Sequence, residues 1–467
     1  MIIFSDFFLT NGWVGKFSKL KSGQSFDLLA LREINAEKYP FFLESSSRGN
    51  EKNRFSILFY KPRILIKKEK NDETSFLKKF DKSWKDQKVE QEKLVFEGKK
   101  IPFCGGWFVY LGYELAKEIE PSLEIPDSPF QLPTAFAARI NTAIIFDHID
   151  NEIFITSDKA EEYENDFKDI MDDIKKTFLK SKIKKEMGFA EISMIGSEKE
   201  HQSQVRTCID YIFQGEIFQA NLSRQWKFKI KNKLEDIEIY RQLRRKNPSP
   251  FSGLITFENS SIISSSPERL VSVDGENLET RPIAGTRPRG RSGLIDIELS
   301  KELINSDKEK AEHLMLLDLE RNDISKVCKA GSVNVNEMMT IESYAHVHHI
   351  VSNVCGKKLD DITPGQIISS VFPGGTITGC PKVRCMQILG ELEKVGRGPY
   401  TGSVGYITHS GNMDINILIR SILREKCNLF FRAGGGIVAD SKPEFETLET
   451  EAKANGMLKA IGSFKND

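Results

Sequence analysis

The sequence has no surplus of charge of either sign. Its 467 residues include 67 Lys+Arg and 67 Asp+Glu, so the formal net charge at pH 7 is +0. Proteins that bind nucleic acid or anionic membranes through their overall field carry a basic excess. The sequence therefore argues against both partners, and any anion that it binds must be held by a local site.

Paired cysteines and long apolar runs are also missing. The seven cysteines are scattered and none forms a Cys-x-x-Cys pair, which argues against zinc and against a disulfide framework. No apolar run approaches the roughly 20 residues that span a bilayer. The first residues lack the basic segment of a signal peptide. We expect a cytoplasmic protein with reduced, mostly buried thiols.

The residues that are present divide the chain into two kinds of segment. The first 157 or so residues mix short apolar runs with turns and predict a strand-rich region. From Asp158 to about Lys185, apolar residues recur at helical spacing in a charged background, which predicts an amphipathic helix with a solvated charged face. Beyond His201, glycine and proline cluster in short loops, which is typical of a site assembled from loops on a rigid scaffold. The coarse class is α+β. The predicted strands include Arg54–Phe59, Arg63–Lys67, Trp107–Tyr110 and Thr142–Phe146.

Two predicted helices carry acidic residues that could hold a metal ion. The first begins at Ser306, where we expect a capping box with Glu309, and it places Glu312 on its second turn. In the second, Glu449 and Lys453 are four residues apart and share a face. Such residues form either exposed ion pairs or a site for Mg²⁺, which prefers carboxylate oxygens. Spacing alone leaves both interpretations open.

Two glycine-rich segments, residues 372–382 and 431–440, place bare backbone beside hydroxyl groups and cations. Glycine lets backbone N–H groups converge on an anion at close range. Neither segment matches the GxxxxGK[ST] or GxGxxG pattern, so a nucleotide phosphate is disfavoured, whereas a carboxylate fits. As isolated loops they could also be simple tight turns.

These segments occur in one order with several others. The set comprises Arg281-Pro-Ile-Ala-Gly-Thr-Arg287, Glu312-His313, Asp318-Leu-Glu-Arg-Asn-Asp323, His349-Ile-Val-Ser352, residues 372–382 and 434–441, and Glu449-Thr-Glu-Ala-Lys453. Together they closely resemble the chorismate-utilising enzymes: anthranilate synthase component I, aminodeoxychorismate synthase component I, and isochorismate and salicylate synthases. The resemblance covers roughly residues 200–462, and the first 160 residues resemble the N-terminal region of the two aminating members.

The resemblance implies a fold and a division of the chain. The fold is a large antiparallel β-sandwich flanked by helices, of class α+β, with two interleaved subdomains. The implied division is an N-terminal region over residues 1–160, a helical linker over 161–197 and a chorismate-binding catalytic domain over 198–462.

Position by position, the resemblance also implies roles for individual residues. It implies Mg²⁺ as the cofactor, held by Glu312 and Glu449, and His349 as the general acid/base. Chorismate is a dianion with a poor leaving group, so a divalent ion, fixed N–H donors and a histidine titrating near neutrality suit its chemistry. His346 and His348 receive no role. The remaining implied positions are Thr376 and Gln219 for catalysis, and Ala284, Thr286, Tyr400, Arg420, Gly434, Gly435, Gly436 and Lys453 for substrate binding.

Two positions separate the members of this family. Isochorismate and salicylate synthases carry a water-activating lysine where this chain has Gln219, so ammonia is favoured over water as the nucleophile. Many aminodeoxychorismate synthases carry a covalently reacting lysine where this chain has Ala284, and anthranilate synthases carry alanine there. Other segments are more similar to aminodeoxychorismate synthase, and residues 247–253 lack the Tyr-Met expected of a tryptophan-controlled enzyme. Our first hypothesis is therefore aminodeoxychorismate synthase component I, in para-aminobenzoate and folate biosynthesis. The alternative is anthranilate synthase component I, which makes anthranilate and pyruvate.

Either amination requires a source of ammonia. No Gly-x-Cys-x-Gly segment followed by His-x-Glu surrounds any of the seven cysteines, so we expect a separate glutamine amidotransferase subunit. A non-catalytic scaffold is a remote alternative, because it would retain Glu312, His349, Glu449 and Lys453 by accident.

Overall fold

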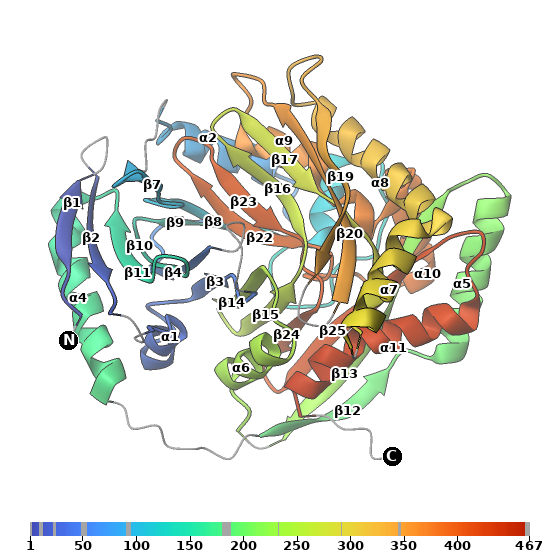
Figure 1. Ribbon diagram of the computed structural model, residues 1–467, viewed down its shortest axis with the longest axis horizontal. Helices are drawn as coiled ribbons and strands as arrows, with labels where there is room; N and C mark the ends of the chain where they lie inside the picture. Colours follow the sequence, from blue (N-terminus) through green and yellow to red (C-terminus); the bar gives the residue numbers. More distant parts are fainter. Residues whose placement is uncertain are drawn as a thin grey trace.

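The computed structural model describes residues 2–8, 13–21, 25–47, 54–89, 95–179, 188–231, 233–290, 292–343 and 347–462. Within these ranges, two large antiparallel sheets form the framework of the molecule (Figure 1). None of the helices in these ranges is both long enough and apolar enough to cross a membrane.

The first sheet has the strand order β1-β2-β11-β10-β4-β3-β14-β15-β24-β25-β13-β12, and β21 pairs with β13. Its strands are β1 (Ser5–Phe8), β2 (Val14–Lys19), β3 (Phe41–Glu44), β4 (Phe55–Tyr60), β10 (Thr142–Asp147), β11 (Glu152–Ser157), β12 (Phe189–Ile195), β13 (Gln219–Lys231), β14 (Phe251–Phe257), β15 (Ser260–Ser266), β21 (Gly379–Cys380), β24 (Ser421–Glu425) and β25 (Asn428–Ile437).

The second sheet has the order β18-β20-β17-β16-β23-β22-β8-β9-β5, and β19 pairs with β20. Strands β6 (Val95–Phe96) and β7 (Lys99–Lys100) form a separate short hairpin. The strands of the second sheet are β5 (Leu65–Lys68), β8 (Gly106–Leu111), β9 (Ala135–Ile140), β16 (Arg269–Asp274), β17 (Asn277–Arg281), β18 (Ile283–Pro288), β19 (Asn334–Ser343), β20 (Val347–Lys357), β22 (Ser403–Thr408) and β23 (Met413–Asn416).

Both sheets combine strands from the two ends of the sequence. In the first sheet the seam lies between β3 and β14, where Phe42 is opposite Leu254. In the second it lies between β8 and β22, where Phe108 is opposite Tyr406. Within residues 161–197, helix α4 is followed by β12, which pairs with β13 on the first sheet.

An aromatic core holds the two sheets face to face. The Phe41 and Phe108 rings stack at 4.2 Å between centroids, and the Phe136 and Phe257 rings stack at 4.3 Å. Offset stacking of this kind adds about 0.5–1.5 kcal/mol per pair to the free energy of burying the rings. Strands β8, β9 and β10 are buried on both faces, which explains why they contain the continuous apolar runs 107–111, 135–138 and 143–146. The architecture confirms the predicted α+β sandwich with interleaved subdomains.

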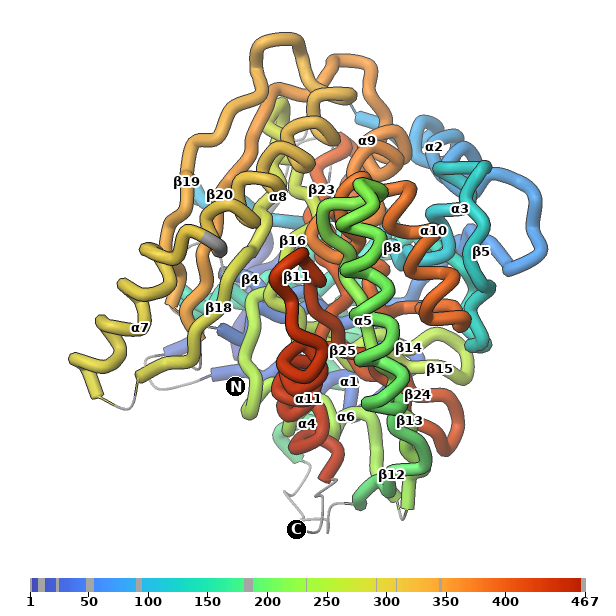
Figure 2. Tube along the Cα trace, turned by 90° about the vertical axis from the view of Figure 1, so that its right-hand side faces the viewer, coloured from blue at the N-terminus to red at the C-terminus, as the bar shows by residue number. Residues whose placement is uncertain are grey.

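Helices cover the outer faces of the sandwich. Those packed against the first sheet include α1, α4, α6 and α11, and those packed against the second include α2, α8 and α9. In Figure 2, α8 and β18 lie toward the upper left of the molecule, and α11 and β25 lie lower and near its centre. The helices are α1 (Leu29–Ile34), α2 (Phe76–Lys85), α3 (Ala116–Ile119), α4 (Ala160–Leu179), α5 (Glu198–Phe213), α6 (Asp236–Lys246), α7 (Gly293–Asn305), α8 (Asp307–Ser325), α9 (Pro364–Val371), α10 (Lys382–Glu393) and α11 (Pro443–Ala460), with short 3₁₀ turns at Tyr113–Leu115 (η3) and Gly375–Ile377 (η4).

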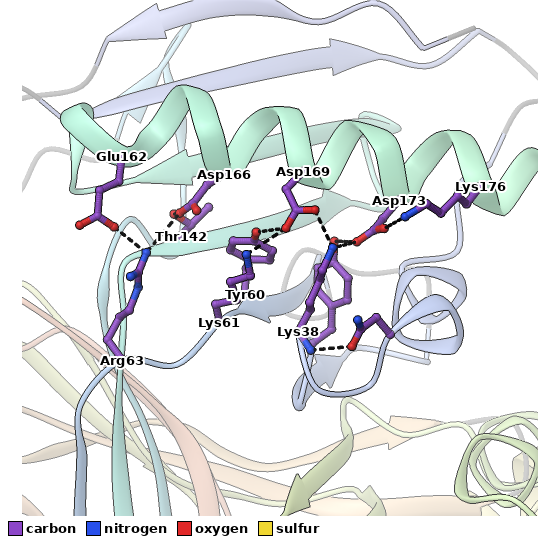
Figure 3. A network of polar contacts seen from close by, with 12 residues as sticks. Lys38, Tyr60, Lys61, Arg63, Thr142, Glu162, Asp166, Asp169, Asp173 and Lys176 are labelled. Carbon is purple, nitrogen blue, oxygen red and sulfur yellow. Dashed lines mark hydrogen bonds and ion pairs between the residues drawn. The ribbon is translucent and has the colours of Figure 1, made fainter.

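The expectation that the charged stripe of α4 faces solvent is wrong in part. Asp169 accepts from Lys38 at 2.6 Å and from the Tyr60 hydroxyl at 2.6 Å, and Asp173 accepts from Lys38 at 2.9 Å (Figure 3). Only 1% of the Asp173 side chain is exposed. Asp166 accepts from a threonine hydroxyl of β10. These carboxylates lie at helical spacing, so one polar stripe holds α4 against the first sheet.

Candidate active site

A cavity of about 720 Å³ lies between the β25–α11 side of the molecule and the β18–α8 side. It brings together residues that are distant in the sequence, from Gln219 to Met457. The predicted site residues that line it are Gln219, Ala284, Thr286, Glu312, His349, Thr376, Tyr400, Arg420, Gly434, Gly436, Glu449 and Lys453. The remaining predicted residue, Gly435, lies between two of these on β25.

The glycines of β25 form a wall of bare backbone. The strand pairs with β13, and a Cβ atom at Gly434 would lie 2.5 Å from the Leu222 carbonyl oxygen. A Cβ atom at Gly436 would lie 2.1 Å from Nε2 of Gln219. Both distances are shorter than real Cβ contacts. At Gly434 the group is backbone, so only glycine lets the strand approach it, whereas a side chain at Gly436 would displace the Gln219 amide.

Acidic side chains converge on the same glycine strand. Gln219 donates from Nε2 to Oε1 of Glu312 at 2.9 Å. A Cβ atom at Gly435 would lie 3.4 Å from Glu446 Oε2 and 3.6 Å from Glu449 Oε1, and one at Gly436 would lie 3.3 Å from Glu312 Oε1. These are the hard oxygen donors that Mg²⁺ prefers, so the residues fit the expected ion.

The predicted pairing of Glu449 with Lys453 is present. Lys453 Nζ lies 2.7 Å from Glu449 Oε1 and also donates to the Gly434 carbonyl oxygen at 2.9 Å. Both side chains are about half exposed, at 49% and 41%. The lysine therefore lies between a candidate metal ligand and the glycine strand, and not on an outer surface of the helix.

His349 lies on β20 and is 3% exposed. Its Nδ1 is 2.9 Å from the hydroxyl oxygen of Thr286 on β18. Burial lowers the pKa of His349 to about 3, and the nearby positive charges of Arg420 and Lys453 also lower it. The expectation of titration near neutrality is therefore wrong for this state of the protein, and the imidazole is neutral at pH 7.

His348, one of the two histidines to which no role was assigned, does not line the cavity. His348 Nδ1 lies 2.7 Å from the Ser343 hydroxyl, and its Nε2 lies 2.9 Å from Asp296. His346 lies outside the residues that the structure describes.

A carboxyl group that the sequence did not single out also lines the cavity. Glu268 is 5% exposed and accepts a hydrogen bond from the Thr376 hydroxyl at 2.7 Å. Burial raises the pKa of Glu268 to about 7, although the Thr376 hydroxyl opposes the shift. A carboxyl group that keeps its proton near neutrality can act as a general acid. In the sequence, Glu268 stands in the segment Ser-Pro-Glu-Arg at 266–269, where residue type and spacing alone give no sign of its burial.

Arg420 supplies a cation to the cavity. It is half-buried, and its guanidinium makes no ion pair with any carboxylate in the described ranges of the chain. Its φ of 50° is left-handed, which is uncommon for a residue other than glycine and is often found at functional sites. Burial lowers the pKa of Arg420. A half-buried cation of this kind is suited to bind a substrate carboxylate.

Tyr400 lies over a buried charge cluster. The Arg397 guanidinium sits 4.8 Å from the Tyr113 ring centroid and 5.6 Å from that of Tyr400. Glu393 accepts from Arg397 at 2.8 Å and pairs with Arg432 at 2.9 Å. The cluster therefore holds the Tyr400 ring against the glycine strand β25.

The start of α8 agrees only in part with its prediction. The Ser306 hydroxyl accepts from the Glu309 backbone N–H at 3.4 Å, as expected for the cap. The Glu309 carboxylate instead pairs with Arg287 at 3.1 Å, because β18 runs beside the helix. The predicted reciprocal capping box is thus replaced by an ion pair to the second sheet.

Comparison with known proteins agrees with this geometry. Residues 39–459 match the family described as chorismate binding enzyme. The chain belongs to this family. It is 36% identical over 465 residues to anthranilate synthase component 1 of Aquifex aeolicus (strain VF5), covering 95% of this chain and 91% of that relative.

Two further members of the family are similar to this chain. Aminodeoxychorismate synthase component 1 of Bacillus subtilis (strain 168) is 38% identical over 365 residues, covering 77% of this chain and 77% of that relative. The crystal structure of anthranilate synthase component I from Streptococcus pneumoniae TIGR4 superposes with a TM-score of 0.76 at 29% identity, covering 86% of this chain and 92% of that one. The protein is thus a chorismate-utilising enzyme, and its relatives include both kinds of aminating synthase.

Proposed function

We propose that this enzyme aminates chorismate to 4-amino-4-deoxychorismate, using ammonia from a separate glutamine amidotransferase subunit. The observation that carries the proposal is the environment of Gln219. Its amide donates to Glu312 and cannot act as a base, so the site has no group at this position to activate water. Ammonia is a nucleophile without prior loss of a proton, and it therefore suits such a site.

The residues of the cavity supply what the substitution needs. Arg420, Lys453 and the glycine backbone of β25 bind the two carboxylates of the substrate. Mg²⁺, held by Glu312 and Glu449, would stabilise negative charge on the substrate when bound. Tyr400 and Thr376, which both line the cavity, would orient the ring.

Glu268 supplies the proton for the leaving group in this proposal. A C–N bond forms as the C4–O bond breaks, and the hydroxyl leaves as water with the proton of Glu268. The new ammonium group then gives up a proton, which restores the Glu268 carboxyl, so the sum is chorismate and ammonia to aminodeoxychorismate and water. His349, which is neutral, can accept a proton but has none to give as an imidazolium.

Anthranilate synthesis is the second candidate. Ala284 lines the cavity with a methyl group, and so the site has no lysine there for covalent attack on the ring. This feature favours the anthranilate reaction, and curated relatives of that name are among the similar proteins. Under the first candidate, ammonia attacks without a lysine adduct.

The product formed from chorismate decides between the two. Purified protein with chorismate, Mg²⁺ and an ammonium salt is expected to give aminodeoxychorismate by mass, without pyruvate, and a chelator is expected to stop turnover. Anthranilate with pyruvate would establish the second candidate instead. No consumption of chorismate by folded protein would refute both.

A further inference from the structure

A second buried carboxyl group, that of Glu320, lies near the proposed proton donor Glu268. Glu268 and Glu320 are 5% and 6% exposed, and they contact successive residues of the η4 turn. The Thr376 hydroxyl donates to Glu268 at 2.7 Å, and the Gly375 backbone N–H donates to Glu320 at 3.3 Å. The two carboxyl groups therefore flank one dipeptide, with Glu268 at the cavity and Glu320 on α8.

Neither carboxyl group has an ion-pair partner within 4.0 Å in the described ranges of the chain. The charged group that faces Glu268, apart from Glu320, is Arg420. The groups that face Glu320 are Asp323 and Lys382, and these two already pair with each other at 2.5 Å. The positive charge nearest to Glu320 is thus engaged by another carboxylate.

Burial raises the pKa of Glu268 to about 7 and that of Glu320 to about 7. The negative charge of Glu320 raises the pKa of Glu268 further, and that of Asp323 raises the pKa of Glu320. Two close carboxyl groups in an apolar setting titrate as a pair, because ionising both places like charges together.

We propose that Glu320 is a positioning residue that acts through Glu268. Its carboxyl group, packed behind the η4 turn, holds Glu268 in the protonated form in which it can give its proton to the departing hydroxyl. This inference rests on the proposed function of Glu268 as the donor. Glu320 itself touches no substrate, since it does not line the cavity.

The test replaces the charge and keeps the shape. In Glu320→Gln the amide oxygen can still accept from Gly375, but the like charge is gone. The alkaline limb of the kcat/KM profile for chorismate amination is expected to move to lower pH by about one unit, which is about a tenfold loss of rate on that limb. A limb at the wild-type position would overturn the proposal.

Matched variants separate this effect from general damage. Glu320→Asp keeps the charge and is expected to retain most of the wild-type limb, whereas Glu320→Ala, a second neutral variant, is expected to shift it as glutamine does. Asp307→Asn removes an exposed charge from the first turn of the same helix and is expected to leave the profile unchanged. A shift of equal size in Asp307→Asn would show a nonspecific charge effect and overturn the proposal.

A measurement without turnover keeps the inference distinct from the proposed function. The infrared band of the protonated Glu268 carboxyl group can be isolated as the difference between spectra with and without the Glu268→Gln substitution. In the Glu320→Gln background this band is expected to disappear at a lower pH than in the wild-type background. If the wild-type enzyme makes neither product, the proposed function fails while this titration still tests the coupling. Equal midpoints in the two backgrounds would refute the coupling even in an active enzyme.

Discussion

Buried glutamates on two sides of the cavity have opposite surroundings. Glu393, on α10, is 3% exposed on its side chain, accepts from Ser223 and pairs with Arg397 and Arg432, and these arginines lower its pKa despite burial. Glu268, near the second sheet, is buried to a similar degree, yet its pKa is raised to about 7. Burial alone therefore does not set the protonation state of a carboxyl group in this enzyme, because the nearest charges decide it.

The contrast separates a structural charge from a chemical one. With its two arginines, Glu393 remains ionised and holds the turn that carries Tyr400. Glu268 has a raised pKa because burial outweighs the opposing charge of Arg420, and the charge of Glu320 adds to the shift. Three changes test this difference, and they are taken from the largest expected effect to the smallest.

The first change removes the proton donor. Glu268→Gln keeps an oxygen that can accept from Thr376 but cannot donate a carboxyl proton, so kcat for chorismate amination is expected to fall about 10²–10⁴-fold. Steady-state kinetics with chorismate and ammonium would measure it. A variant with wild-type kcat would show that the leaving hydroxyl obtains its proton elsewhere.

The second change removes the paired charge. Glu393→Gln leaves two buried arginines without their counter-ion, and the free energy of unfolding is expected to fall by about 3–5 kcal/mol. Denaturant unfolding at pH 7 measures this loss. The pKa of Glu393 is lowered on folding, so its stabilising contribution is present above about pH 4.5 and is lost as the pH falls.

Glu391→Gln is the control for this second change, since Glu391 is on the same helix with a side chain that is 57% exposed. Equal stability of the two variants would contradict the assignment of Glu393 to a buried ionic cluster.

The third change extends the comparison to a buried base. His201 is 1% exposed, its Nδ1 lies 2.9 Å from the Thr447 hydroxyl, and burial lowers its pKa from 6.5 to about 4. Below pH 6.5 the unfolded chain binds a proton that the folded chain does not, so the free energy of unfolding decreases as the pH is lowered. The loss between pH 7 and pH 4 is expected to reach about 3 kcal/mol.

His201→Gln cannot titrate, so the variant is expected to lose less stability over the same pH range. Parallel unfolding curves of wild type and variant at several pH values give the difference. The same slope in both proteins would mean that His201 keeps an ordinary pKa in the folded state.

The sequence predicted which residues meet in the cavity far better than it predicted their ionisation. The order of the motifs was enough to bring Gln219, Glu312, His349 and Lys453 to one place, because the resemblance specifies a shared fold. The pKa of His349 could not follow from its residue type, since it depends on burial between β18 and β19 and on cations from distant segments.

Local patterns were similarly limited where tertiary contacts intervened. The strand at Thr142 and the helix near Asp158 were visible as apolar runs and helical spacing. The carboxylates of α4 were expected in water, but Lys38 and Tyr60 come from another segment to meet them. Spacing along one helix contains no information about such partners.

The interleaving of the sheets has a consequence for the making of this protein. Strand β3 pairs with β14, which lies about 200 residues further along the sequence, and β8 pairs with β22, which lies about 300 residues further along. During synthesis the first segments therefore emerge with open strand edges and cannot complete their sheets until most of the chain has been made. Pairings this distant in sequence slow folding, and unprotected edges favour association with other chains. The seams that join the two halves of the sandwich therefore leave its first strands with unpaired edges until late in synthesis.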